Sequence, residues 1–325
     1  MKQKVYITRR IPEIGIDMLK EKFEVKIFFE NRRVDKTLLI REIEECNAIV
    51  SLLSDKIDEE ILNASGNLKI VANYAVGYNN IDIQAAKSRK IMVTNTPGVL
   101  TNATGEIAFA LLITLTRKII DADRFTRKGK FIGWDPLLYL GDELNGKTLG
   151  IIGMGRIGRD MAFKCRAFGM NVIYYSRKPV DERFEKEVQA AYVTFKELLE
   201  NSDVISVHTP LTEETFHMLD EKAFGRMKKG VYIINTSRGE VIDEKVLVHE
   251  LKSGKVKGAG FDVYEFEPEI TKDLLTMNNV VLLPHIGSAT IETRNKMSEM
   301  VAENIIAALE GRRPENLVPE LSDLF

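Results

Sequence analysis

The chain has 325 residues, of which 44% are hydrophobic and 29% charged, and its formal net charge is −2. This length exceeds the usual size of one domain, so two domains are expected. The nearly balanced charge gives no sign of a nucleic-acid or membrane partner, and no run reaches the ~18 apolar residues of a membrane span. Two cysteines and a start without a secretory leader predict a reducing cytoplasm.

Residues 1–99 alternate short apolar runs with amphipathic segments. The runs predict strands near residues 4–8, 25–29, 48–53, 69–74 and 91–95, with helices between them. Strands that are apolar throughout and separated by helices are typical of a parallel sheet covered on both faces. This part of the chain therefore predicts a doubly wound α/β domain.

The alternation stops at residues 101–130, which keep a helical period without a break. A helix of roughly 25 residues would span about 37 Å, enough to bridge two domains. A second strand–helix alternation starts near residue 147, and another long helical pattern follows residue 290. We therefore expect an inserted domain over residues 100–287, a discontinuous first domain over 1–99 and 288–325, and a cleft between them.

The inserted domain opens with "GIIGMGRIG", in which Gly153, Gly155 and Gly158 have G-x-G-x-x-G spacing. The spacing alone is a weak signal, and a glycine-rich turn without a ligand is the alternative. Here the motif follows an apolar strand and opens a helix, so the glycines can form a tight turn for a dinucleotide pyrophosphate at the helix N-terminus. Met154, Arg156 and Ile157 complete the predicted loop.

The next strand ends in Ser176, Arg177 and Lys178, where an NAD site usually carries an acid for the ribose 2′-hydroxyl. The first acid comes only at Asp181. Two cations and a hydroxyl suit a 2′-phosphate, which favours NADP(H), although NAD(H) can be bound by such a turn too. The alternative is that both cations lie on a solvated turn.

Other strands of the inserted domain also end in polar residues. Because ligands of doubly wound sheets bind at the carboxyl ends of the strands, these residues form a candidate site. They are Thr209 and Pro210, then Thr236, Ser237 and Arg238, then Asp262 and Glu267, and finally His285 with Gly287.

The chemistry of this set suggests hydride transfer to a carbonyl group. A histidine can protonate the alkoxide at neutral pH, a carboxylate beside it favours the imidazolium, and an arginine polarises the carbonyl. Taken singly, Arg238 could be a surface cation and Glu267 a solvated acid. We interpret His208 as structural and His217 and His249 as surface groups, and no spacing of ligands predicts a metal site.

Five blocks of the sequence resemble the D-isomer-specific 2-hydroxyacid dehydrogenases, in that family's order and over the whole chain. They are "GIIGMGRIG", "VHTPLT", "INTSRGEVID", "FDVYEFEP" and "LLPHIGSAT". The resemblance implies a flavodoxin-like substrate domain with an inserted Rossmann domain. It also implies that Arg238 binds substrate, that Glu267 pairs with His285, that His285 exchanges the proton, and that Asp262 meets the nicotinamide carboxamide.

Within the family, "YAVGYNNID" and "VTNTPGVLT" are similar to glyoxylate/hydroxypyruvate reductases of archaeal type. This resemblance implies that Val76 and Gly77 bind the substrate carboxylate and that Leu52 or Leu53 lines the side-chain pocket. It also implies a homodimer in which Trp134 reaches the partner's active site, although Trp134 could equally be a packing residue.

We therefore expect an NAD(P)H-dependent reductase of small 2-keto acids, foremost glyoxylate and hydroxypyruvate. Two alternatives stay open: a dehydrogenase of the D-lactate or D-glycerate type, and a nucleotide-sensing corepressor that binds the cofactor without turnover.

Overall fold

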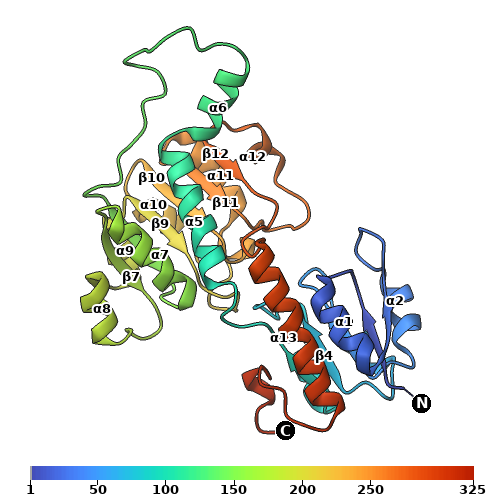
Figure 1. Cartoon of the computed structure of the whole chain (residues 1–325). Helices are drawn as coiled ribbons and strands as arrows, with labels where there is room; N and C mark the ends of the chain where they lie inside the picture. The colour runs from blue at the N-terminus through green and yellow to red at the C-terminus, as the bar shows by residue number, and fades with distance from the viewer. Residues whose placement is uncertain (1) are drawn as a thin grey trace. The chain divides into compact units, whose positions relative to one another are not determined.

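The computed structural model describes residues 2–325 and divides into two compact units. The first unit runs to Leu100 and resumes at Ser288–Phe325, and the second unit is Thr101–Gly287. Both are α/β (Figure 1). The predicted fold class, two doubly wound parallel sheets, is confirmed.

The first unit contains a five-stranded parallel sheet in the order β2-β1-β3-β4-β5, which is the flavodoxin-like order. Its strands are β1 (Lys4–Ile7), β2 (Glu24–Ile27), β3 (Ala48–Ser51), β4 (Ile70–Asn73) and β5 (Met92–Thr94). Its helices are α1 (Glu13–Lys22), α2 (Lys36–Ile43), α3 (Glu59–Asn63), α4 (Ile83–Ser88) and α13 (Ile291–Leu309), with a short 3₁₀ turn at Pro319–Leu321.

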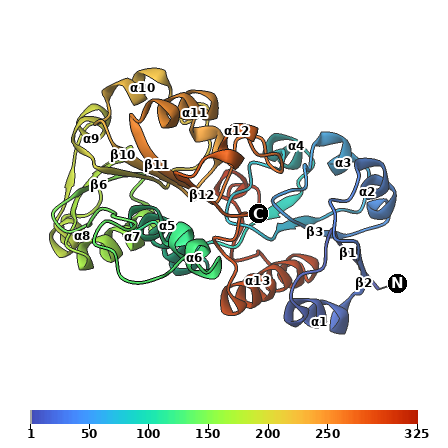
Figure 2. The same ribbon diagram turned by 90° about the horizontal axis from the view of Figure 1, so that it is seen from above.

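Two apolar cores cover the two faces of this sheet. One core joins α1 and α13 to the sheet, and the other joins α2, α3, α4 and the C-terminal turn. Figure 2 shows the same division, with α1 and α13 on one side of the strands. The sheet is therefore buried on both faces, as its continuous apolar strands predict.

The second unit contains a seven-stranded parallel sheet in the order β12-β11-β10-β9-β6-β7-β8. Its strands are β6 (Thr148–Ile152), β7 (Asn171–Tyr175), β8 (Ala190–Tyr192), β9 (Val204–Val207), β10 (Val231–Asn235), β11 (Val256–Phe261) and β12 (Val280–Leu282). The chain order reverses between β6 and β9, which makes this a Rossmann sheet with its switch point between those strands. The short edge strand β8 was not predicted.

Helices cover both faces of the second sheet (Figure 2). On one face lie α5 (Thr101–Thr116), α7 (Arg156–Ala167) and α8 (Glu182–Val188), and on the other lie α9 (Phe195–Asn201), α10 (Glu221–Arg226), α11 (Glu244–Ser253) and α12 (Lys272–Thr276). A 3₁₀ turn spans Gly239–Val241, and α6 (Ile119–Arg127) follows α5.

The prediction of one long helix over residues 101–130 is wrong, because the helix ends at Thr116 and α6 begins at Ile119. Lys118 has a left-handed backbone, with φ 52°. The carbonyl of Thr116 accepts the N–H of Asp142 at 2.9 Å. This carbonyl oxygen would accept an N–H of the next turn if the helix continued, and it is bonded to Asp142 instead.

Many helices begin with an aspartate or threonine whose side chain accepts a backbone N–H of the first turn. Such caps satisfy N–H groups that have no partner within the helix. They are Asp35, Asp58, Asp82, Asp181, Thr194, Asp220, Asp243 and Thr290.

Candidate active site

The glycine loop joins β6 to α7 at the switch point of the second sheet. Gly153 has φ +97°, and a Cβ there would lie 2.6 Å from the carbonyl oxygen of His208. A Cβ on Gly158 would lie 2.2 Å from the carbonyl oxygen of Gly153, so α7 packs directly on the turn. A Cβ on Gly155 would meet no atom within 4 Å. Gly153 and Gly158 are therefore packed against neighbouring backbone, whereas Gly155 has free space beside it, where a pyrophosphate could approach the backbone.

The other predicted loop residues differ in exposure. Met154 is buried, Ile157 is half-buried, and Arg156 is exposed as the first residue of α7. Arg156 thus stands beside the N-terminus of the helix, where its charge could meet a phosphate.

The turn after β7 exposes Arg177 and Lys178, while the hydroxyl of Ser176 donates to the carbonyl of Lys178. Asp181 does not face this turn as a free acceptor. Its carboxylate accepts the N–H of Phe184 and pairs with Arg159 at 3.1 Å, and these bonds lower the pKa of its carboxyl group. Arg177 and Lys178 are thus exposed cations, whereas the exposed carboxylate of Asp181 is already bonded to Arg159 and Phe184.

The segment after β9 carries Thr209 and Pro210 beside the glycine loop, and beyond them the chain forms a shallow hollow of about 400 Å³. The hollow is lined by Leu211, Thr212, Glu213 and Phe216. No role was predicted for these residues. In the sequence they are marked only by two apolar side chains, Leu211 and Phe216, in an otherwise polar turn.

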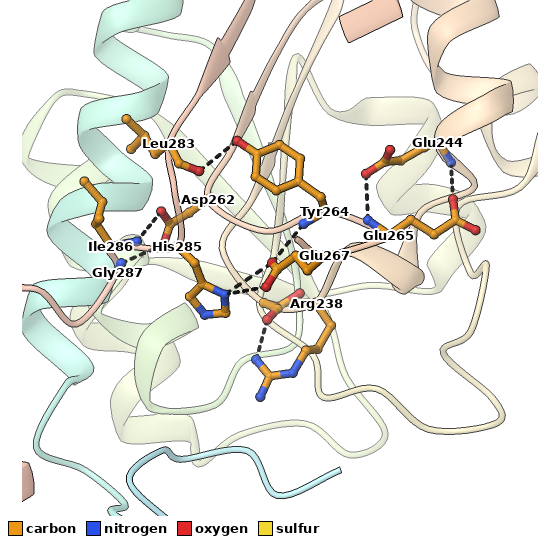
Figure 3. Close-up of polar contacts among 11 residues, drawn as sticks. Arg238, Glu244, Asp262, Tyr264, Glu265, Glu267, Leu283, His285, Ile286 and Gly287 are labelled. Carbon is orange, nitrogen blue, oxygen red and sulfur yellow. Dashed lines mark hydrogen bonds and ion pairs between the residues drawn. The ribbon is translucent and has the colours of Figure 1, made fainter. Parts of the chain in front are cut away.

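His285 and Glu267 are hydrogen-bonded in the second unit (Figure 3). The imidazole Nδ1 lies 3.0 Å from Glu267 Oε2 and 3.2 Å from Oε1, and Glu267 also accepts the N–H of Tyr264 at 3.1 Å. Burial raises the pKa of Glu267, but the bond from His285, the N–H of Tyr264 and the charge of Arg238 outweigh it and lower the pKa below its usual value. The carboxylate is thus ionised at neutral pH and fixes Nδ1 as the donor to it, which leaves Nε2 for a substrate.

Arg238 lies near this pair, after β10. The backbone here is held by Asn235, whose amide donates to the Arg238 carbonyl at 2.8 Å, and Arg238 Nη1 donates to the carbonyl of Ser237 at 2.6 Å. Burial lowers the pKa of the guanidinium, while the charges of Glu267 and Glu240 raise it. A cation partly removed from water is suited to bind a carboxylate or a carbonyl oxygen.

The neighbouring strand end places Thr236 and Ser237 differently. Thr236 is buried and its hydroxyl has no protein partner among the described residues, whereas Ser237 donates both its N–H and its hydroxyl to Asn235 Oδ1. Of these two hydroxyl groups, that of Thr236 is the one without a protein hydrogen-bond partner among the described residues.

Asp262 holds the chain that carries His285. Its Oδ1 accepts the N–H of Ile286 at 2.7 Å, and its Oδ2 accepts the N–H of Gly287 at 2.6 Å. Burial raises the pKa of Asp262, and these bonds together with the charge of His285 oppose the shift. A Cβ on Gly287 would lie 3.0 Å from Asp262 Oδ2, so glycine allows this close approach.

In the first unit, the predicted substrate residues lie in two loops after β3 and β4. Leu52 is half-buried, Leu53 is 37% exposed, and Val76 and Gly77 are half-buried. The amide of Asn80 donates to the carbonyls of Leu52 and Asp55, at 3.1 and 3.0 Å, which ties the two loops together.

Two further asparagines hold the second loop. Asn73 donates to the carbonyl of Gly77 at 2.9 Å, and Asn95 donates to the carbonyl of Val76 at 2.7 Å. None of these bonds uses the N–H of Val76 or Gly77. The loop is therefore fixed through its carbonyl groups.

His217 was predicted to be a surface group, and its side chain is 30% exposed but bonded to another side chain. Its Nε2 lies 2.7 Å from Glu265 Oε1, and its ring stacks on Phe216. His249 is exposed, as expected. His208 is held by Ser206 at 2.8 Å, and its buried Nδ1 has no protein partner among the described residues.

Comparisons with known proteins decide the family. Residues 109–287 match the family model described as "D-isomer specific 2-hydroxyacid dehydrogenase, NAD binding domain". The glyoxylate reductase of Thermococcus litoralis is 50% identical over 322 residues, which cover 98% of this chain and 97% of that one. The chain belongs to the D-isomer-specific 2-hydroxyacid dehydrogenase family. It is therefore an oxidoreductase with a nicotinamide-nucleotide-binding domain.

Solved structures of similar proteins agree over the full length. A protein of Thermus thermophilus is 39% identical with a TM-score of 0.92, covering 97% of this chain and all of that one. An NADPH-dependent glyoxylate/hydroxypyruvate reductase of Sinorhizobium meliloti, solved with NADP and malonate, is 32% identical with a TM-score of 0.88, covering 98% of both chains. Within residues 2–325, no helix has the length and apolar character needed to cross a membrane.

Proposed function

We propose that this 2-hydroxyacid dehydrogenase is an NADPH-dependent reductase of small 2-keto acids, with glyoxylate as the foremost substrate and hydroxypyruvate as the second. The observation that carries the proposal is the His285–Glu267 pair beside Arg238, on the same unit as an open glycine loop. The relatives named as glyoxylate reductases support the choice of substrate.

The second unit would bind the cofactor. The glycine loop from Gly153 to Gly158 would hold the pyrophosphate, and further contacts would come from Ser176, Thr209, Pro210, Thr236, Ser237, Asp262 and Gly287. Arg177 and Lys178 would bind the 2′-phosphate, because both are exposed and Asp181 is engaged elsewhere. The bound nicotinamide supplies the hydride for the carbonyl carbon.

The protein's own groups would complete the reaction. Arg238 would bind the carboxylate or carbonyl oxygen of the keto acid, and Val76 and Gly77 would offer N–H groups to the carboxylate, with Leu52 or Leu53 against the side chain. His285 would donate its Nε2 proton to the carbonyl oxygen as the alcohol forms. Glu267, bonded to Nδ1, would keep the ring oriented and stabilise its charge.

Substitution of His285 by alanine tests this mechanism. We expect kcat for glyoxylate reduction to fall roughly 10²–10⁴-fold, with the affinity for NADPH nearly unchanged. The exposed histidine His249, changed in the same way, is the matched control. Parent-level turnover in His285→Ala would refute the role of His285, and tight NADPH binding without turnover of any 2-keto acid would favour a corepressor-like protein.

The cofactor preference has its own test. We expect the parent to have a higher kcat/KM with NADPH than with NADH, and Arg177→Ala with Lys178→Ala to lose that difference. Lys186→Ala on α8, also a surface cation, should leave the preference unchanged. An equal or better kcat/KM of the parent with NADH would contradict the role of the two cations. The ranking of kcat/KM for glyoxylate, hydroxypyruvate and pyruvate in the same assay separates the alternatives. Glyoxylate in first place supports the proposal, pyruvate in first place indicates a D-lactate type, and hydroxypyruvate in first place indicates a D-glycerate type.

We also propose a homodimer in the cytoplasm. The chain after α6 exposes several large apolar side chains, among them Ile132 (98% exposed), Trp134 (85%) and Leu137 (75%). A contiguous exposed apolar segment usually marks a protein interface, and Trp134 would reach the partner's active site. The thiols of Cys46 and Cys165 are free and buried, as is usual in a reducing compartment.

A further inference from the structure

The second unit contains another histidine–glutamate pair, whose glutamate lies close in sequence to the glutamate assigned to the reaction. His217 Nε2 lies 2.7 Å from Glu265 Oε1, and Glu265 stands two residues before Glu267. Both histidines have left-handed backbones, with φ 47° at His217 and 54° at His285. Such a conformation is uncommon for a residue other than glycine and persists where the surroundings enforce it.

Glu265 is bonded reciprocally to Glu244, the first residue of α11 (Figure 3). Its Oε2 accepts the N–H of Glu244 at 3.0 Å, and Glu244 Oε1 accepts the N–H of Glu265 at 2.7 Å. Glu244 is only 2% exposed, and its Oε2 accepts the hydroxyl of Thr271. Burial raises the pKa of Glu244, and the bond from Thr271 and the N–H of Glu265 oppose the shift.

Glu244 is buried and the side chain of Glu265 is only 11% exposed, so their carboxylate oxygens need donors, because an unsatisfied acceptor shielded from water is costly. The imidazole of His217 supplies the donor to Glu265 Oε1, and Asp243 lies 3.8 Å from its other nitrogen. His217 is thus the side-chain donor that completes the network of Glu265 and Glu244.

The backbone connects this network to Arg238. The N–H of His217 donates to the carbonyl of Glu240 at 2.8 Å, and the N–H of Leu219 donates to the carbonyl of Val241 at 3.1 Å. A Cβ on Gly239 would lie 1.8 Å from the carbonyl carbon of Tyr264, so the residue after Arg238 touches the segment that carries Glu265.

The same segment also positions Glu267. The N–H of Tyr264 donates to Glu267 Oε1, and Tyr264 is the residue directly before Glu265. A shift of Glu265 would therefore move a donor of Glu267 and the backbone against Gly239 together.

We propose that His217 is a positioning residue for the reduction, acting through Glu265 and Glu244 to set Glu267 and Arg238 relative to each other. The inference rests on the function proposed above. His217 does not touch the reacting atoms, and its loss would displace groups that do. Small displacements of this kind lower the rate of the chemical step rather than the binding of cofactor.

The test compares two substitutions of one side chain. His217→Gln keeps an N–H that can reach Glu265, and His217→Met has similar length without a donor. We expect the Met variant to lose roughly 10–100-fold in kcat for glyoxylate. The Gln variant should stay within about threefold of the parent, because it retains the hydrogen bond. His249→Met is the matched control at an exposed histidine.

Three readouts separate positioning from a structural role alone. In His217→Met the dissociation constant for NADPH should be unchanged, and the thermal midpoint identifies any loss of folded protein. The primary isotope effect with NADPH deuterated at the transferred position should rise, because hydride transfer becomes slower relative to product release. An unchanged kcat and isotope effect in the folded Met variant would overturn the proposal.

A second variant covers the case in which His217→Met does not fold. Glu265→Gln keeps the volume of the side chain and one acceptor, and we expect it to lower kcat and raise the isotope effect in the same way. Parent-like values in this variant would also overturn the proposal.

The last measurement does not depend on turnover. The chain has four histidines, so labelled imidazole resonances can be assigned by single substitution. The His285 resonance should shift in Glu265→Gln and in folded His217→Met, and stay in place in His249→Met. An unmoved His285 resonance would refute the inference. Failure of the parent to reduce any 2-keto acid would instead refute the proposed function.

Discussion

The carboxylate of Asp262 illustrates how one residue fixes the backbone beside a proposed proton donor. Each of its oxygens accepts one N–H, from Ile286 and from Gly287, and the residue is 1% exposed. Loss of an acceptor would leave the partly buried N–H of Ile286 or the buried N–H of Gly287 without a partner, which costs about 1–3 kcal/mol.

We expect Asp262→Asn to lower the free energy of unfolding by about 1–3 kcal/mol and to reduce kcat, because the asparagine amide replaces one acceptor with a donor. Thermal unfolding and glyoxylate reduction measure the two effects. Asp273→Asn on α12, where the carboxylate is largely exposed, is the control. An Asp262→Asn protein with parental stability would show that the two N–H groups find other partners.

His208 gives a pH dependence of stability. Burial lowers its pKa from 6.5 to about 4. The unfolded chain therefore binds the proton first, and the contribution to stability is complete above about pH 6.5 and is lost as the pH falls toward 4. The full effect is up to about 3 kcal/mol.

His208→Gln should remove this part of the pH dependence, because glutamine does not titrate. Unfolding by urea at pH 7.5 and pH 4.5 measures it, with His249→Gln as the control. If the parent and His208→Gln lost the same stability between these pH values, His208 would not be the group responsible.

At the scale of elements, the turn between β6 and α7 separates two roles of glycine. Gly155 has free space where a Cβ would point, whereas Gly158 lies against the carbonyl of Gly153. Gly155 is thus available to a ligand, and Gly158 allows the close packing of α7 on the turn.

We expect Gly155→Ala to weaken NADPH binding at least roughly tenfold without changing the thermal midpoint, because the methyl group occupies the approach of the pyrophosphate. Gly158→Ala should instead cost about 1–3 kcal/mol of stability through overpacking. Fluorescence titration and calorimetry distinguish the two. Unchanged NADPH affinity in Gly155→Ala would contradict the assigned binding loop.

Most of the elements could be predicted because each strand is an apolar run closed by a polar turn. The strand β8 could not, since its three residues, Ala190–Tyr192, are too short for a pattern to show. The end of α5 depends on Asp142, which lies 26 residues beyond Thr116 in the chain, and no local signal marks it.

The same limit applies to the candidate site. Arg238, Glu267 and His285 were predicted because they follow neighbouring strands of one sheet. His217 was misjudged because its partner, Glu265, lies 48 residues away in the chain, and no local pattern connects the two. Contacts between loops depend on how the loops fold, which a pattern of hydrophobicity does not encode.

At the scale of the whole molecule, the segment after α6 has the strongest consequence for assembly. Ile132 and Trp134 are nearly fully exposed, and α6 has no buried residue. Apolar side chains exposed together are unfavourable in water unless another surface covers them.

We expect the unmutated protein to have, by sedimentation, twice the 36.8 kDa mass of one chain. The double variant Ile132→Asp with Trp134→Asp should have the mass of one chain. Charged groups buried in an apolar interface would be left without partners. Phe29→Asp, at another exposed apolar residue (73%), should leave the mass unchanged. A parent of single-chain mass would contradict the proposed dimer.

The discontinuity of the first unit has a consequence for the newly made chain. Its sheet is complete once Thr94 has been synthesised, but the face over Val5, Val50 and Ala72 is covered by α13, which begins at Ile291. The second unit is continuous and can fold while α13 is still being translated. Until α13 is made, α1 is the only helix on this face of the N-terminal sheet, so part of the face is expected to stay exposed to water, where it can aggregate or bind a chaperone.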